Sequence, residues 1–136
     1  MTVDLRRTIL DATDLTRQKV HVKEWGVDVW VRAITGTERD RMESQWTRRR
    51  TASGRDDGDN TEFRAFAVCW CCVDEDGKPV FDTNSDVIAI GKKAMLPLVK
   101  LFTVADALNG FTSVQVEELA GNCEAGESAG STSDSP

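Results

Sequence analysis

The sequence predicts an α+β fold, mostly helical, in which an N-terminal β-hairpin packs on a small bundle of four to five helices. Valines alternate with other residues between positions 19 and 32, a period typical of half-buried strands. From residue 63 onward, apolar residues recur at spacings of three and four, as helices require. The last residues, EAGESAGSTSDSP, are small, polar and acidic. We therefore expect one domain over residues 1–123, with a flexible loop at 51–60, and a disordered tail over 124–136.

Within the hairpin, Trp25-Gly26 is the predicted two-residue turn, because glycine supplies the positive φ that tight turns need. The predicted pairs are Glu24–Val27, Lys23–Asp28, Val22–Val29, His21–Trp30 and Val20–Val31. This register places four valines on one face, for the core, and His21, Trp30 and an opposite-charge pair on the other. A slip by one residue would divide the valines between both faces.

Two helices are predicted around the flexible loop. Thr35 and Glu38 form a capping-box pattern that begins a very polar helix, which ends near residue 50 and has one narrow apolar stripe, Met42 and Trp46. After the loop, Asn60 or Thr61 is the predicted cap of a second helix. Its apolar residues, from 63 to 72, occupy almost every position, so we expect this helix to be the most buried element.

The remaining elements are shorter or lie nearer the ends. Residues 5–15 predict a short helix or an ordered arm. Asn84 or Ser85 is the predicted cap of a short helix that Gly91 ends. A long helix is predicted from Met95 to about Asn109, with Pro97 in its first turn and Gly110 as its stop, and a last short helix from 114 to about 119.

Composition excludes several classes of protein. No apolar run approaches the roughly 20 residues of a membrane span, and the N-terminus has early acids and no apolar signal segment. The net charge of −6 argues against general nucleic-acid binding, which needs a positive surface. Residues 1–55 hold 12 Lys/Arg against 8 Asp/Glu, whereas residues 56–136 hold 5 against 15. These opposed halves would favour contacts between copies, although ordinary mixed surface charge explains them as well.

No pattern predicts catalysis or a cofactor. Cys69, Cys71 and Cys72 lie in one apolar run, where buried thiols are the simplest interpretation; a zinc site would need Cys123 or His21 as the fourth ligand. His21 is the only histidine and has no nucleophile elbow to serve. The acidic turn at 74–77 lacks the rest of a calcium loop. We therefore expect a binding or assembly protein with no catalytic, cofactor-binding or metal-binding residues.

The candidate interaction residues are His21, Trp25 and Trp30. Trp25 lies at the predicted hairpin tip, and Trp30 lies on the face away from the valines, beside His21. Aromatic side chains exposed at such places often mark protein interfaces. The alternative for Trp30 is that a helix of the same chain covers it.

The order of features resembles the tail assembly chaperones of long-tailed bacteriophages. The resemblance lies in KEWGVDVWVRAITGTERDRME, the buried segment followed by VDEDGKPVF, then LVKLFTVADALNGF and VEELAGN. It runs from about residue 18 to 122, and the order and spacing of these pieces carry it rather than any single motif.

The resemblance implies a non-enzymatic chaperone that binds the tape measure protein, keeps it soluble and promotes polymerisation of the tail tube around it. It implies self-association, a further contact with the major tail tube protein, a place in the host cytoplasm and absence from the mature virion. The competing class is a head–tail connector or tail-completion protein retained in the virion. A third, a small zinc-binding regulator, would require metal in the purified protein.

Overall fold

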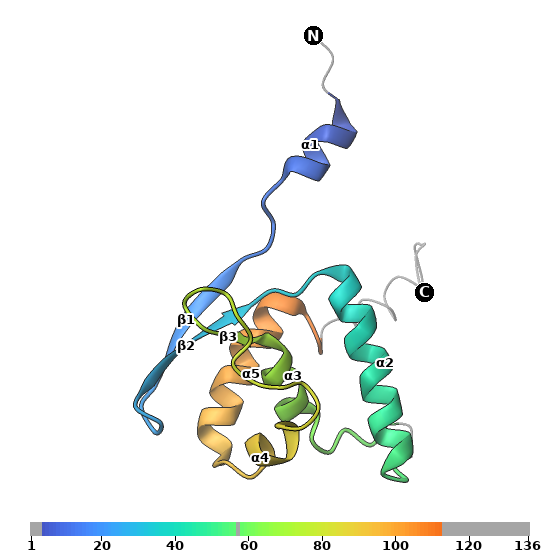
Figure 1. Ribbon diagram of the computed structural model, residues 1–136, viewed down its shortest axis with the longest axis vertical. Coiled ribbons are helices and arrows are strands. Elements are labelled where there is room, and N and C mark those ends of the chain that lie inside the picture. The colour runs from blue at the N-terminus through green and yellow to red at the C-terminus, as the bar shows by residue number, and fades with distance from the viewer. Residues whose placement is uncertain (1–3, 57, 113–136) are drawn as a thin grey trace, which may run out of the picture.

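The computed structural model describes residues 4–56 and 58–112 and has the predicted α+β class (Figure 1). Its elements are α1 (Leu5–Asp11), β1 (Arg17–Val22), β2 (Val27–Arg32), α2 (Gly36–Ala52), α3 (Phe63–Cys71), β3 (Cys72–Val73), α4 (Val87–Gly91) and α5 (Met95–Asn109). Figure 1 shows the sheet and α2 on opposite sides of α3 and α5, whereas α1 extends away from the body. The predicted helix at 114–119 and the predicted disordered tail at 124–136 lie outside the described residues.

The strands form an antiparallel sheet in the order β1-β2-β3. The predicted hairpin register is wrong by two residues: Val22 pairs with Val27 and Val20 with Val29, so the connecting turn is residues 23–26 rather than two residues. Gly26 serves this longer turn with a φ of 65° and donates its N–H to the Val22 carbonyl. Because the shift is an even number, each strand keeps its faces. The buried valines are the predicted four, Val20, Val22, Val29 and Val31.

The helix α2 begins at the predicted capping box. The Glu38 N–H donates to Thr35 Oγ1 (3.0 Å), and the Thr35 N–H donates to Glu38 Oε1 (2.9 Å), which satisfies two amides at the helix start. Met42 and Trp46 are the buried residues of α2, as predicted. One narrow stripe therefore attaches this long polar helix to the body.

The predicted cap of α3 is wrong. Neither Asn60 nor Thr61 caps the helix; Glu62 precedes it in the left-handed region, with a φ of 73° and no side-chain cap bond. The Glu62 carboxylate instead pairs with Arg49 Nε (3.1 Å) and Arg55 Nη2 (3.2 Å). These two ion pairs hold a backbone conformation that is uncommon for a residue with a side chain.

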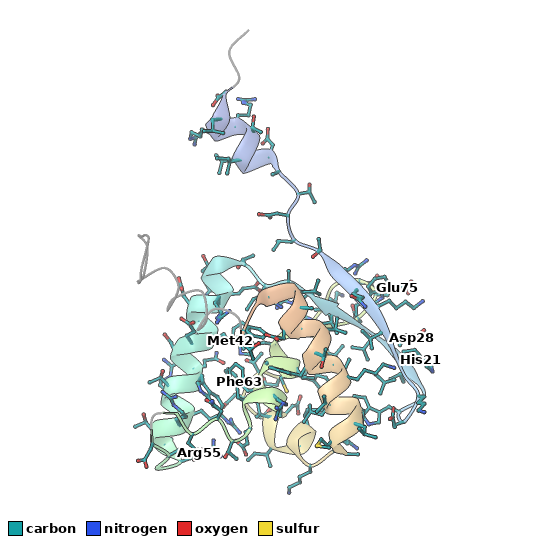
Figure 2. All side chains as sticks on the ribbon, turned by 180° about the vertical axis from the view of Figure 1, so that it is seen from behind. His21, Asp28, Met42, Arg55, Phe63 and Glu75 are labelled. Atoms are coloured by element: carbon teal, nitrogen blue, oxygen red, sulfur yellow. The ribbon has the colours of Figure 1, made fainter. Side chains whose placement is uncertain are left out.

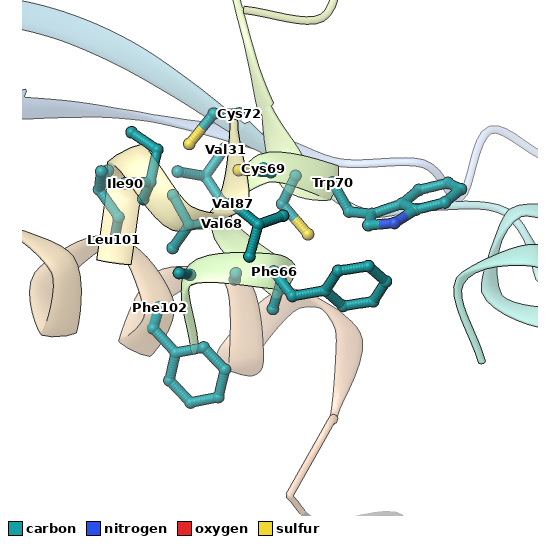
Figure 3. Close-up of a cluster of buried hydrophobic side chains, with 14 of the residues drawn as sticks. Val31, Phe66, Val68, Cys69, Trp70, Cys72, Val87, Ile90, Leu101 and Phe102 are labelled. Carbon is teal, nitrogen blue, oxygen red and sulfur yellow. The ribbon is translucent and has the colours of Figure 1, made fainter. Parts of the chain in front are cut away.

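The core is built on α3, which is the most buried helix, as predicted: all seven residues from 65 to 71 are buried. Figure 3 shows Phe66 and Val68 of this helix among Val87 of α4 and Leu101 and Phe102 of α5. Aromatic rings continue the cluster towards α2, where the Trp46 ring lies 5.3 Å from that of Phe66. Apolar burial of this kind, at about 25 cal/mol per Å², is the main driving force for the fold.

The helix α3 ends one residue earlier than predicted, because Cys72 and Val73 form the third strand. Cys72 pairs with Val31 and Val73 pairs with Trp30, so the strand completes the edge of β2. The acidic turn then closes on Asp74, whose side chain accepts the N–H groups of Asp76 and Lys78, both at 2.9 Å. The Asp74 side chain thus satisfies two amide donors of the turn.

The last two helices form the outer wall of the core. Asp82 accepts the Asn84 and Ser85 N–H groups, and Asp86 is the residue before α4, so the predicted caps of this helix are wrong by one or two residues. The bounds of α5 are those predicted, with Pro97 buried in its first turn. Gly110 ends α5 in the left-handed conformation, with a φ of 68°. None of the described helices is both long enough and apolar enough to cross a membrane.

Candidate protein-interaction surfaces

The outer face of the hairpin carries two of the three predicted interaction residues. In the observed register His21 lies opposite Asp28, and Trp30 lies opposite Lys19, so the predicted direct pairing of His21 with Trp30 is wrong. Both side chains nevertheless share the face away from the buried valines, because strand residues alternate between faces. The sheet therefore brings His21 and Trp30 onto one surface, as neighbours across a diagonal.

The polar part of this face is a small cluster around Asp28. The His21 Nδ1 atom lies 2.7 Å from Asp28 Oδ1, and since a carboxylate can only accept, the proton of this bond is on Nδ1 (Figure 2). Lys19 Nζ lies 3.7 Å from the other carboxylate oxygen. The hydrogen bond from His21 is the main reason that the pKa of Asp28 is below its ordinary value. All three groups are exposed, so the cluster contributes little to the stability of the fold.

The apolar part of the face surrounds Trp30. The Arg17 guanidinium lies 4.2 Å from the Trp30 ring centroid, and Arg17 also donates to the Glu75 carbonyl (3.0 Å). Trp30 is half-buried, with Arg17 over its ring. Val27 (46% exposed) and Val80 (47% exposed) line a shallow hollow beside Trp30. Val27 belongs to the valine face of β2, so the hollow lies at the edge of this strand, which β3 pairs only at Trp30 and Val31. We call Trp30, Val27 and Val80, with Arg17 at their border, the hairpin patch.

Trp25 occupies a different environment. It belongs to the four-residue turn, and its side chain is half-buried against the hydrophobic core. Its indole ring therefore covers the end of the core next to the turn and presents only part of its surface outward. Of the three predicted residues, the structure brings His21 and Trp30 together and leaves Trp25 apart from them.

A groove on the opposite side of the molecule was missed by sequence reasoning. One face of α2 forms its wall, the start of α3 and the residues after α5 complete it, and its volume is about 480 Å³. The floor is apolar, and Figure 2 shows Met42 and Phe63 lying between α2 and α3. Arg39 lies at its border, with its guanidinium 4.9 Å from the Phe111 ring centroid. The α2 groove is lined by Arg39, Met42, Glu43, Trp46, Thr47, Arg50, Asn60, Phe63, Phe111 and Thr112.

The N-terminal arm, residues 4–16, also exposes apolar side chains. Leu5, Ile9 and Leu10 of α1 are 68%, 62% and 64% exposed, and α1 has no buried residue. The sequence shows the arm and the shared face of these three residues, but it does not show that the body leaves that face uncovered. A second exposed set, Ile88, Met95 and Leu96, lies at the junction of α4 and α5.

The three cysteines of α3 and β3 are buried thiols, as predicted. Burial raises the pKa of Cys69 and of Cys71 to about 12, and it raises that of Cys72 further above the ordinary value. Thiols of this kind are poor nucleophiles at neutral pH. Across residues 4–56 and 58–112, no three His, Cys, Asp or Glu side chains are grouped to hold a metal ion.

Comparison with solved structures relates this fold to that of a phage protein. No protein-family model and no curated protein matches the sequence. Among solved structures, the tail assembly chaperone of bacteriophage HK97 matches with a TM-score of 0.51 and 20% sequence identity, over 76% of this chain and 91% of that chain. The chain has the fold of a phage tail assembly chaperone. The match confirms the resemblance seen in the sequence at the level of the fold, and it includes nearly all of the HK97 chaperone.

Proposed function

We propose that this protein is a phage tail assembly chaperone that binds the tape measure protein, keeps it soluble and promotes polymerisation of the tail tube around it. The observation that carries the proposal is the fold shared with 91% of the HK97 tail assembly chaperone. The order and spacing of the sequence features from about residue 18 to 122 support the same assignment. Such a protein acts by binding alone, in the host cytoplasm, and requires no catalytic residue or cofactor.

The hairpin patch is the surface that we assign to the client. A long helical client exposes apolar stripes until the tail tube covers them, and an apolar patch bordered by charged residues of both signs suits such a stripe. The patch is small, so one contact is weak. Many copies of the chain along one client would add their weak contacts by avidity, and self-association of the copies would strengthen this effect.

Co-expression of the chain with the tape measure gene of the same phage tests the proposal. We expect the client to be soluble only when the chain is present; an equally soluble client without the chain would overturn the chaperone assignment. Mass spectrometry of purified virions distinguishes the competing class, because an abundant signal from this chain would indicate a retained connector or tail-completion protein.

Single substitutions then test the surface. Trp30→Ala removes the largest side chain of the hairpin patch. We expect it to reduce the soluble client by at least about tenfold, because a loss near 1.4 kcal/mol weakens even a single contact tenfold and avidity multiplies the effect. Ile88→Ala is the control, since Ile88 is an exposed apolar residue (53%) that lies away from the hairpin, on α4. Equal effects of the two substitutions, with both variants folded, would move the client contact away from the hairpin.

A further inference from the structure

We propose that the N-terminal arm of one copy of the chain binds a second copy, in a shallow hollow beside the start of α5. The arm is residues 4–16, and the volume of the hollow is about 370 Å³. The contact joins two copies and is measured without a client, so it does not rest on the proposed function. It rests on the state of the arm, on the surface of the hollow and on the charges at their borders.

The arm contains a helix that its own chain does not support. Isolated helices shorter than about 12 residues are marginal in water, and α1 has seven residues, none of them buried. The Asp4 side chain caps its start by accepting the Arg7 N–H (3.2 Å), but a cap alone does not offset the entropy of ordering a whole helix. The helix therefore needs a surface to pack on, and Figure 1 shows it extended away from the body.

The side of α1 that would pack is an apolar stripe. At helical spacing Leu5 and Ile9 share one face, and their side chains are 68% and 62% exposed. Leu10, which is 64% exposed, borders this stripe. Large apolar side chains gathered on one exposed face mark a contact surface, because each of them stays in water until a partner covers it.

The hollow presents an apolar surface that is itself exposed. The α5 residues that line it, Met95, Leu98 and Val99, recur at spacings of three and four, so they form one face of the first turns of the helix. Met95 is 70% exposed, and Leu98 and Val99 are half-buried. The opposite wall comes from the start of α3 and the residues that precede it. Docking of the arm would thus remove apolar surface of both partners from water.

Within one chain the arm and the hollow lie far apart. The base of the arm is Thr16, which accepts the Ala33 N–H (2.8 Å), and the Asn109 side chain at the end of α5 accepts the N–H of the next residue, Ile34. Met95 begins α5 fourteen residues earlier, or about 21 Å away along the helix. Figure 1 shows the arm leaving the body at the end farthest from the α4–α5 junction. In this conformation the arm of one copy therefore meets the hollow of another.

The charges at the two borders are opposite. On α1, Asp4 and Asp11 are seven residues apart and lie along the same side of the stripe, while the two arginines of α1 lie on its other side and at the back. Beside the hollow, Arg64 and Lys93 are exposed lining residues. The remaining charged lining residue, Glu62, is neutralised by its two ion pairs with arginines. The acidic side of the stripe thus fits the cationic border of the hollow.

Disulfide trapping between two chains tests the contact directly. In a Cys123→Ser background, a chain with Ile9→Cys is mixed with a chain that carries Met95→Cys or, as the control, Val80→Cys. Val80 is also an exposed apolar residue (47%), but it belongs to the hairpin patch. With oxidised glutathione as the oxidant, and after correction for the reactivity of each single thiol, we expect the disulfide to form at least about ten times faster with Met95→Cys, because docking raises the effective concentration.

Three outcomes of the trapping overturn the proposal. Equal rates for the two acceptor chains would do so, as would the absence of any disulfide between chains. The third concerns a chain that carries both Ile9→Cys and Met95→Cys. If its disulfide closes within one chain, at a rate independent of protein concentration, the occupant of the hollow is the arm of the same chain.

Sedimentation velocity gives a second measurement, on single substitutions in the arm. Ile9→Asp places a charge in the stripe, and we expect it to weaken the association of the copies by at least about tenfold. Arg7→Ala is the control, because Arg7 lies on the face of α1 opposite the stripe, and it should change the association by less than about twofold. A parent chain that stays monomeric, or unchanged association of a folded Ile9→Asp chain, would contradict the proposal.

Discussion

The Asn109 side chain joins three parts of the fold, and its removal gives a sharp prediction. Asn109 Oδ1 accepts the Ile34 N–H (2.8 Å), and Nδ2 donates to the Arg32 carbonyl (3.1 Å) and to the Ala105 carbonyl (3.0 Å). The first two bonds connect the end of α5 to the segment between β2 and α2. The residue therefore fixes the end of α5, just before Phe111, against the start of α2, the helix that forms the groove wall.

We expect Asn109→Ala to lower the free energy of unfolding by about 2 kcal/mol. Each of the two bonds to the β2–α2 segment contributes about 1 kcal/mol, and the Ile34 N–H left without its acceptor adds up to about 1 kcal/mol. The better helix propensity of alanine offsets about 0.5 kcal/mol. Asn109→Asp keeps an acceptor for Ile34 but turns a carboxylate oxygen towards two carbonyl oxygens at a helix C-terminus. We expect that variant to be at least as destabilised at pH 7.

Urea unfolding followed by far-UV circular dichroism measures both variants at constant m-value. The control is Asn84→Ala, because Asn84 is exposed and its side-chain contact to Arg49 is long (3.5 Å). Asn84→Ala should stay within about 0.5 kcal/mol of the parent chain. An Asn109→Ala loss as small as that of the control would refute the assignment of Asn109 as a structural link.

Three further predictions use other parts of the molecule. Burial raises the pKa of Glu38, but the hydrogen bonds from Thr35 and Arg32 and the Arg32 charge lower it more, to below its ordinary 4.5. Glu38 therefore stabilises the fold above that pH, and the deficit of Glu38→Gln, about 1 kcal/mol at pH 7, should shrink as the pH falls towards 3 in urea titrations. In a Cys123→Ser chain, the three buried thiols should react with Ellman's reagent only after unfolding; fast reaction of the native chain would contradict their burial. Deletion of residues 1–11 should change the free energy of unfolding by less than about 0.5 kcal/mol, since α1 buries nothing; a larger loss in the monomer would show that α1 packs on the body.

Sequence reasoning succeeded where the interacting atoms lie within a few residues of each other. The capping box at Thr35 and Glu38 and the stop at Gly110 both depend on contacts across three or four residues. The bounds of α5 follow from the same local chemistry, with Pro97 in the first turn. The burial of α3 was also predictable from the sequence, because nearly every position of that segment is apolar.

The hairpin register could not be fixed in this way. Registers that differ by two residues give the same valine face, so the hydrophobic pattern cannot distinguish them. The longer turn is observed together with Trp25 packed against the core, a tertiary contact that periodicity does not report. The same shift changed the neighbours of the predicted site, placing His21 with Asp28 and Trp30 with Lys19.

The predicted extent of α3 failed for a related reason. Helical periodicity continues through Cys72, but that residue pairs with Val31, which lies 41 positions earlier in the chain. The unpaired edge of β2 thus takes a residue that local propensity assigns to the helix. The α2 groove is a tertiary feature as well, since its walls come from three segments that are distant in sequence.

The polarity of α2 explains why a groove exists at all. A helix with a broad apolar face would pack flush on α3 and leave no space, whereas α2 buries only Met42 and Trp46. Polar links then hold it at both ends: Arg32 pairs with Glu38 (2.9 Å) at its start, and Arg49 pairs with Glu62 (3.1 Å) near its end. Between these links Met42 and Trp46 are buried at the base of the groove, and the polar residues of α2 around them leave the space that forms it.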